Sequence, residues 1–107
     1  MSGAGASRRA STQASLAQDA AVTIRAMRRQ GVSLVHAVRP LLAARGYRMK
    51  DLAQIARCPD WQVYNALAGH MPPPLRLRAA LRGILGVDPW QVAQEVEAET
   101  LAQEGRA

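Results

Sequence analysis

The sequence has no phenylalanine, and its aromatic residues are two tryptophans and two tyrosines among 107 residues. It also lacks any segment in which apolar and polar residues alternate, as a half-exposed β-strand would require. Hydrophobic residues nevertheless make up 49% of the chain, with alanine and leucine most frequent. Because both favour helices over sheets, the composition predicts a single all-α domain.

Cysteine is almost absent: Cys58 is the only one, so no internal disulfide can form. With the two histidines, His36 and His70, it gives no spacing typical of a metal site, and there is no glycine-rich phosphate loop. No motif brings a nucleophile and a base together. We therefore expect no cofactor, no metal, no small-molecule substrate and no enzymatic activity.

Long hydrophobic runs are missing too. No segment has about 18 uninterrupted apolar residues, and the two arginines near the start are not followed by an apolar run of signal-peptide length. We therefore expect a soluble, cytoplasmic protein with no membrane partner.

Acidic residues are few over most of the chain. The whole chain carries 14 basic and 8 acidic residues, a net charge of +6. Residues 1–87 hold 13 basic and 3 acidic residues, whereas residues 88–107 hold 1 basic and 5 acidic residues. A basic body with an acidic tail suggests a polyanionic partner such as nucleic acid; the alternative is a basic surface that is merely solvated.

The chain divides into an arm and a helical domain. Residues 1–13 are small, polar and basic, and they predict a disordered arm because they lack the apolar surface that would offset the entropy of ordering. Residues 14–104 predict the domain, beginning with an additional N-terminal helix over 14–30 that ends before Gly31. The apolar face of this helix consists of Leu16, Ala20, Ile24 and either Met27 or Arg28.

A second helix begins after Ser33, which can cap it, and runs to Arg45. Pro40 falls inside this pattern, so either the helix is kinked there or a shorter helix begins at Pro40; we favour the kink. After the proline-rich segment 70–74, a further helix ends at Gly86. Its apolar side consists of Leu75, Leu77, Leu81, Ile84 and Leu85.

The last helix covers residues 89–103, with Asp88 as its cap and Pro89 at its first position. Its apolar residues can pack on the domain, and its glutamates face water or a basic neighbour. The apolar set is Trp90, Ala93, Val96 and Leu101, and the glutamates are Glu95, Glu97 and Glu99.

Residues 49–69 predict two short helices separated by Arg57-Cys58-Pro59. Helices joined by so short a turn cross steeply, which requires a small residue where they approach, Ala53, and an apolar plug, Val63. The second helix then presents its first turns outward, at a width that fits the major groove of DNA. Its outward residues are Asp60, Trp61, Gln62, Tyr64 and Asn65.

The segment "GYRMKDLAQIARCPDWQVYNALAG" resembles the helix-turn-helix of the Cro and lambda-repressor-like regulators. Gly46, the Leu52-Ala53 pair, Val63 and Gly69 match the family's pattern, and the resemblance covers residues 33–94. The pieces "NALAGHMPPP" and "GVDPW" are similar to the Ner-like regulators of transposable phages. The resemblance implies a lambda-repressor-like domain of five to six helices that binds DNA.

The sequence departs from the family's pattern at Met49, where glutamine is common, and at two residues of the turn. Arg57 replaces the turn glycine, so it is expected to adopt a left-handed conformation. Pro59 replaces the usual serine or threonine cap and cannot accept a hydrogen bond through its side chain. We therefore expect the second helix to begin one residue later, with Asp60 as cap and Trp61 as its first residue.

The resemblance also implies roles for individual residues. Gln62 and Asn65 are the expected base readers, because a side-chain amide can bond to adenine at two positions. Trp61 either touches a thymine methyl group or packs over the adjoining helix, and Tyr64 completes the base-contacting set. The expected phosphate contacts are Arg48, Lys50, Arg57 and, ranked below them, His70.

Two functions remain open. The first is sequence-specific binding of double-stranded DNA by a phage or prophage transcriptional regulator, which occupies an operator in a bacterial or phage-infected host cell. The alternative is a protein-interaction adaptor built on a helix-turn-helix. DNA binding is favoured if Arg48, Lys50 and Arg57 project in the same direction as Gln62 and Asn65.

The role of helix 14–30 is open as well. It can dock on the domain, form the interface of a homodimer, or carry its three arginines, Arg25, Arg28 and Arg29, toward DNA. The resemblance implies that a dimer would read two half-sites about 34 Å apart.

Overall fold

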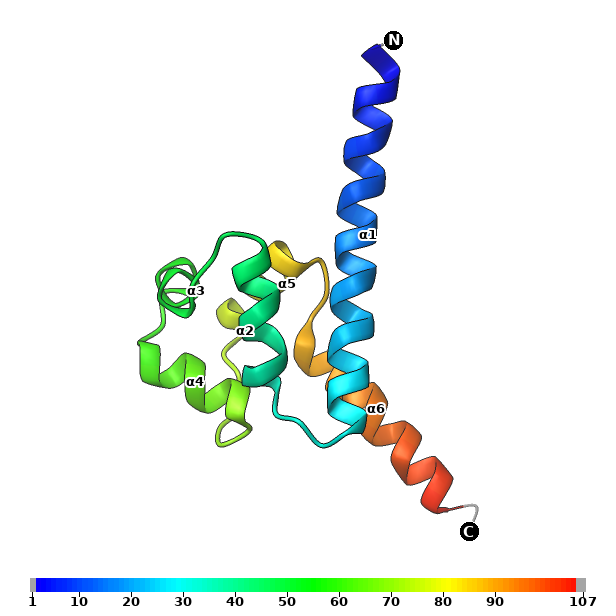
Figure 1. Cartoon of the computed structure of the whole chain (residues 1–107). Coiled ribbons are helices and arrows are strands. Elements are labelled where there is room, and N and C mark those ends of the chain that lie inside the picture. The colour runs from blue at the N-terminus through cyan, green and yellow to red at the C-terminus, as the bar shows by residue number, and fades with distance from the viewer. Residues whose placement is uncertain (1, 106–107) are drawn as a thin grey trace.

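The computed structural model describes residues 2–105, and the environments of side chains from residue 15 to 105. These residues form helices and no strand, which confirms the all-α prediction (Figure 1). The helices are α1 (Ser2–Arg29), α2 (Leu34–Ala44), α3 (Met49–Ala56), α4 (Asp60–Ala68), α5 (Leu75–Leu85) and α6 (Pro89–Glu104). Among the described residues, no helix is both long enough and apolar enough to cross a bilayer.

Helix α2 lies at the centre of the domain. It packs against α1, α4, α5 and α6, while α3 contacts α4 and α5. Aliphatic side chains with almost no exposed surface fill the space between these helices, and their burial is the main source of stability. They include Ile24, Val38, Leu42, Leu52, Val63, Leu67, Leu77, Leu81 and Leu85.

Helix α1 docks on the domain through its C-terminal half (Figure 1). Ala20 and Ile24 are fully buried, and two ion pairs join α1 to α6: Arg25 to Glu95 at 3.2 Å and Arg29 to Glu99 at 3.0 Å. Three roles were considered for this helix. Of these, the structure shows that it docks on the domain. Glu95 and Glu99 thus meet basic neighbours, whereas Glu97 is exposed and forms no ion pair within the described part of the chain.

Helix α1 begins at Ser2, within the segment 1–13 for which a disordered arm was expected; residue 1 lies outside the described residues. A helix that is already formed grows by one hydrogen bond per added residue without repeating the cost of nucleation. Because the alanine- and serine-rich segment contains no proline, it offers nothing that would stop the helix at residue 14.

Three leucines expected on packed faces are exposed: Leu16, Leu75 and Leu101, at 41%, 82% and 63% of their surface. Leu75 is the first residue of α5, and Leu101 lies in the last turns of α6, which extends beyond the other helices (Figure 1). Helical periodicity indicates which face a residue occupies, but not whether another element covers that turn.

The ends of the helices follow local chemistry. Asp88 caps α6 as predicted, because its carboxylate accepts hydrogen bonds from the backbone N–H groups of Trp90 and Gln91 at 3.0 and 3.4 Å. Ser33 occupies the position before α2 but makes no side-chain cap bond. Pro40 lies inside α2, which is one helix from Leu34 to Ala44, so no shorter helix begins at the proline.

Candidate functional site

Helices α3 and α4 are joined by Arg57, Cys58 and Pro59. Figure 1 shows α3 nearly end-on while α4 runs across the view, so the two helices cross steeply. Arg57 has φ 56° and ψ 43°, the left-handed conformation predicted for it. Cys58 is buried, and its N–H donates to the Ala53 carbonyl at 3.0 Å, which closes the turn.

The start of α4 corrects the predicted register. Pro59 takes the cap position and Asp60 is the first helical residue, one position earlier than expected. The Pro59 carbonyl already accepts hydrogen bonds from the N–H groups of Gln62 and Val63, at 3.0 and 3.3 Å. Capping by a side chain is thus not required for the helix to begin, because the carbonyl of the cap residue makes the first helical bonds.

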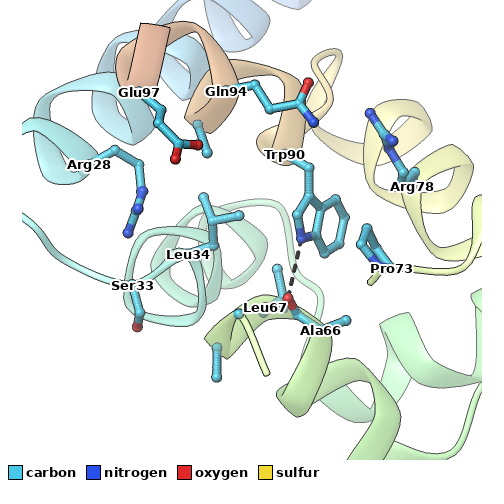
Figure 2. Close-up of a pocket in the computed structure, with 13 residues that line it drawn as sticks. Arg28, Ser33, Leu34, Ala66, Leu67, Pro73, Arg78, Trp90, Gln94 and Glu97 are labelled. Carbon is cyan, nitrogen blue, oxygen red and sulfur yellow. Dashed lines mark hydrogen bonds between the residues drawn. The ribbon is translucent and has the colours of Figure 1, made fainter. Parts of the chain in front are cut away.

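The inner side of α4 is held in two ways. Val63, Ala66 and Leu67 are buried in the core. In addition, the indole N–H of Trp90, from α6, donates to the Ala66 carbonyl at 3.2 Å (Figure 2). Because a buried indole N–H without a partner is costly, this bond fixes the position of α4 relative to α6.

The outer side of α4 presents aromatic residues more than amides. Trp61 is 62% exposed and Tyr64 39% exposed, whereas Gln62 and Asn65 are half-buried. Two interpretations of Trp61 were open. Its large exposed fraction does not fit the one in which it packs over the adjoining helix. Gln62 and Asn65, the expected base readers, are thus less exposed than Trp61 and Tyr64.

The cations expected to touch phosphate lie in two places. Arg48 and Lys50 lie at the N-terminal end of α3, and Arg57 follows the last residue of that helix. All three are exposed, but only Arg57 adjoins the start of α4. The exposed His70 follows the end of α4, where its backbone N–H donates to the Asn65 carbonyl at 2.9 Å.

Arg48 is partly engaged with Asp51. The Asp51 carboxylate accepts the backbone N–H of Arg48 at 2.8 Å and its side-chain Nε at 3.4 Å. These two hydrogen bonds, the backbone one foremost, hold the pKa of Asp51 below its usual value. Part of the Arg48 charge is thus compensated by the Asp51 carboxylate.

Arg76 belongs beside the turn, although the sequence did not single it out as a site residue. Its Nε donates to the Arg57 carbonyl at 3.3 Å, and its side chain is exposed. This brings the exposed Arg76 side chain to the turn at which α4 begins. The two residues are 19 positions apart, so helical periodicity could not predict their contact.

Among residues 2–105, no three histidine, cysteine, aspartate or glutamate side chains gather as a metal site. The candidate site consists of helices α3 and α4, their exposed aromatic residues and the neighbouring cations. Neither a protein-family model nor a curated protein nor a solved structure matches this chain.

Proposed function

We propose that the protein is a sequence-specific double-stranded DNA-binding regulator of the lambda-repressor-like kind, which places α4 in the major groove. As a phage or prophage transcriptional regulator, it would act by occupying an operator. The observation that carries the proposal is a short helix, α4, that is anchored from behind by Trp90 and leaves Trp61 and Tyr64 exposed. A rigidly supported helix is what base reading requires, because a small displacement breaks bidentate bonds.

Each group of residues has a distinct role in this proposal. Gln62 and Asn65 read base edges, and Trp61 and Tyr64 add apolar contact with thymine methyl groups. Lys50, Arg57 and Arg76 contact phosphates, with smaller contributions from Arg48 and His70. Because phosphates border the groove on both strands, these cations need not form one cluster.

One observation favours the second candidate, a protein-interaction adaptor. Ile55, Trp61 and Tyr64 are exposed on α3 and α4, and tryptophan and tyrosine are enriched at the energetic centres of protein interfaces. Arg48 and Lys50 are separated from Arg57 by the length of α3, which also favours the adaptor. Binding measurements with DNA distinguish the two functions.

The first measurement is titration of random duplex DNA at two salt concentrations. If Lys50, Arg57 and Arg76 neutralise phosphates, affinity falls steeply with salt, with a logarithmic slope of about −0.9 for each phosphate contacted. Replacing each of these residues by glutamine lowers affinity for all sequences alike and makes the slope shallower by about one. Arg29→Gln is the matched control, because Arg29 lies on α1 and is paired with Glu99 of α6. Binding that is independent of salt contradicts the proposal.

The second measurement is selection of preferred sequences from a pool of duplexes. We expect Gln62→Ala and Asn65→Ala to relax the preference at individual positions, by about 1–3 kcal/mol for each lost bidentate contact, while Gln18→Ala, on the exposed side of α1, leaves it unchanged. A site with two-fold symmetry would indicate a homodimer. If neither α4 variant changes the preference, these residues are not the readers.

A further inference from the structure

A cavity of about 280 Å³ lies behind α4, where that helix, α2 and α6 meet (Figure 2). Leu34 from α2, Leu67 from α4 and Trp90 from α6 form its apolar walls. This volume is close to the lower end of the range of about 300–1,000 Å³ that is usual for small-molecule sites. The cavity therefore has room for a ligand with one apolar group.

Two charged side chains of opposite sign line the same cavity. Arg28, near the end of α1, and Glu97, on α6, lie on one side of Trp90 in Figure 2. Within the described part of the chain, neither residue forms an ion pair. Arg28 donates through Nη1 to the Val32 carbonyl at 2.8 Å, while its Nε is buried and has no partner among these residues.

The neighbouring charges on the same two helices are paired instead. Arg25 bonds Glu95 and Arg29 bonds Glu99. Arg25 and Arg29 on either side of Arg28 are thus ion-paired, although the Arg25 Nε, like that of Arg28, is buried without a partner among the described residues. Among the described residues no carboxylate neutralises the Arg28 charge, so its guanidinium is suited to an anionic acceptor in the cavity.

Two further polar groups of the cavity, the Arg78 guanidinium and the Trp90 indole N–H, are already engaged. Arg78, across Trp90 from Arg28 in Figure 2, donates to the Asp88 carboxylate from Nε and Nη2 at 2.8 and 2.7 Å. The indole N–H of Trp90 is bonded to the Ala66 carbonyl. Charge recognition at this site therefore depends on Arg28 and Glu97.

We propose that this cavity binds a free α-amino acid with an apolar side chain. The side chain lies between Leu34, Leu67 and Trp90, the carboxylate bonds Arg28, and the ammonium group bonds Glu97. A purely anionic ligand would meet the Glu97 carboxylate, and a purely cationic one would meet the Arg28 guanidinium; the zwitterion satisfies both. The ligand is bound without being transformed, and the site does not depend on DNA binding.

The test uses the full-length protein without DNA and L-phenylalanine as the probe. The Trp90 indole N–H resonance is the readout, because the group is hydrogen-bonded at the cavity wall; Trp61→Phe identifies it by removing the other indole signal. For a ligand of about a dozen heavy atoms, we expect a saturable shift with a dissociation constant on the order of 1 mM. Phenylacetate and phenethylamine, each lacking one charge, bind about tenfold more weakly or worse.

Two variants and their controls decide the outcome. Arg28→Gln and Glu97→Gln each weaken L-phenylalanine binding about tenfold or more, whereas Arg29→Gln and Glu99→Gln, which change the adjacent ion pair, do not. Glu97 is exposed, so its variant remains informative even if Arg28→Gln unfolds. The proposal is overturned by a shift that does not saturate, by equal binding of phenylacetate or phenethylamine, or by unchanged binding in Glu97→Gln.

Discussion

Single side chains help to hold the helices of the candidate site in place. Asp51 places a carboxylate in the first turn of α3, where it accepts the backbone N–H of Arg48 and meets the positive end of the helix dipole. Trp90 acts from outside the pair of helices through its bond to the Ala66 carbonyl. Both contacts give a hydrogen-bond partner to a polar group that would otherwise lack one. They therefore fix the geometry of α3 and α4.

The Asp51 contact predicts a dependence of stability on pH. Because hydrogen bonds from Arg48 lower the pKa of Asp51 in the folded state, the contribution of Asp51 is present above the unfolded-state pKa of about 3.9 and is lost as pH falls through the lower folded-state value. The free energy of unfolding measured with urea should therefore be higher for the native chain than for Asp51→Asn at pH 7, with the difference vanishing in acid. Asp19→Asn, on the exposed side of α1, is the control. A difference that persists in acid would show that ionisation is not the cause.

At the scale of elements, the packing of α1 depends on a close approach to the turn between α5 and α6. Gly86, at the end of α5, has φ 82°, and a Cβ atom added there would lie 2.6 Å from Cβ of Ala17 on α1. Arg45, which follows α2, also donates to the Leu16 carbonyl at 2.7 Å. The docked part of α1 thus begins near Leu16 and Ala17.

Substitution of Gly86 tests this close approach. Gly86→Ala should lower the free energy of unfolding through a left-handed backbone, by about 1–2 kcal/mol, and through overpacking against Ala17, by about 1–3 kcal/mol more. Gly46→Ala is the matched control: Gly46 also has φ 82°, but nothing lies within 4 Å of an added Cβ. Urea denaturation measures both. Equal losses in the two variants would mean that α1 does not press on the turn.

At the scale of the whole molecule, charge and packing divide the fold into two sides. The glutamates Glu95 and Glu99 are bound along α1, away from the turn at which Arg57 and Arg76 meet. The acidic tail of the sequence therefore serves in part to dock α1. The α3–α4 side keeps the exposed cations Lys50 and Arg57 and the exposed aromatic residues.

The integration of α1 into the domain can be measured directly. Ile24 is fully buried, and its replacement by alanine should cost about 2–5 kcal/mol in the free energy of unfolding. Val22 is 55% exposed on the same helix, so Val22→Ala should change stability by about 0.5 kcal/mol or less. Chemical denaturation of both variants gives the comparison. If Ile24→Ala costs no more than Val22→Ala, α1 is not part of the cooperative unit.

Much of the fold could be predicted because it depends on near neighbours. The break at Arg57, the Asp88 cap and the end of α5 at Gly86 each involve contacts within one turn of helix. The predicted start of α4 is wrong by one residue, because the backbone carbonyl of Pro59 makes the first helical hydrogen bonds without a side-chain cap. DNA contact by the predicted site residues stays a prediction.

The sequence by itself determined the helical composition, the positions of most breaks and the lopsided charge, since these follow from local backbone preferences and residue identity. Only the tertiary structure decided that Leu16 and Leu75 are exposed, that Arg76 joins the turn, and that Arg28 and Glu97 line one cavity. The physical reason is that such contacts join residues far apart in the chain, up to 70 positions in the ion pairs of α1 and α6. Periodicity assigns each side chain to a face of its own helix, but the partner of that face is set by how all the helices share one core.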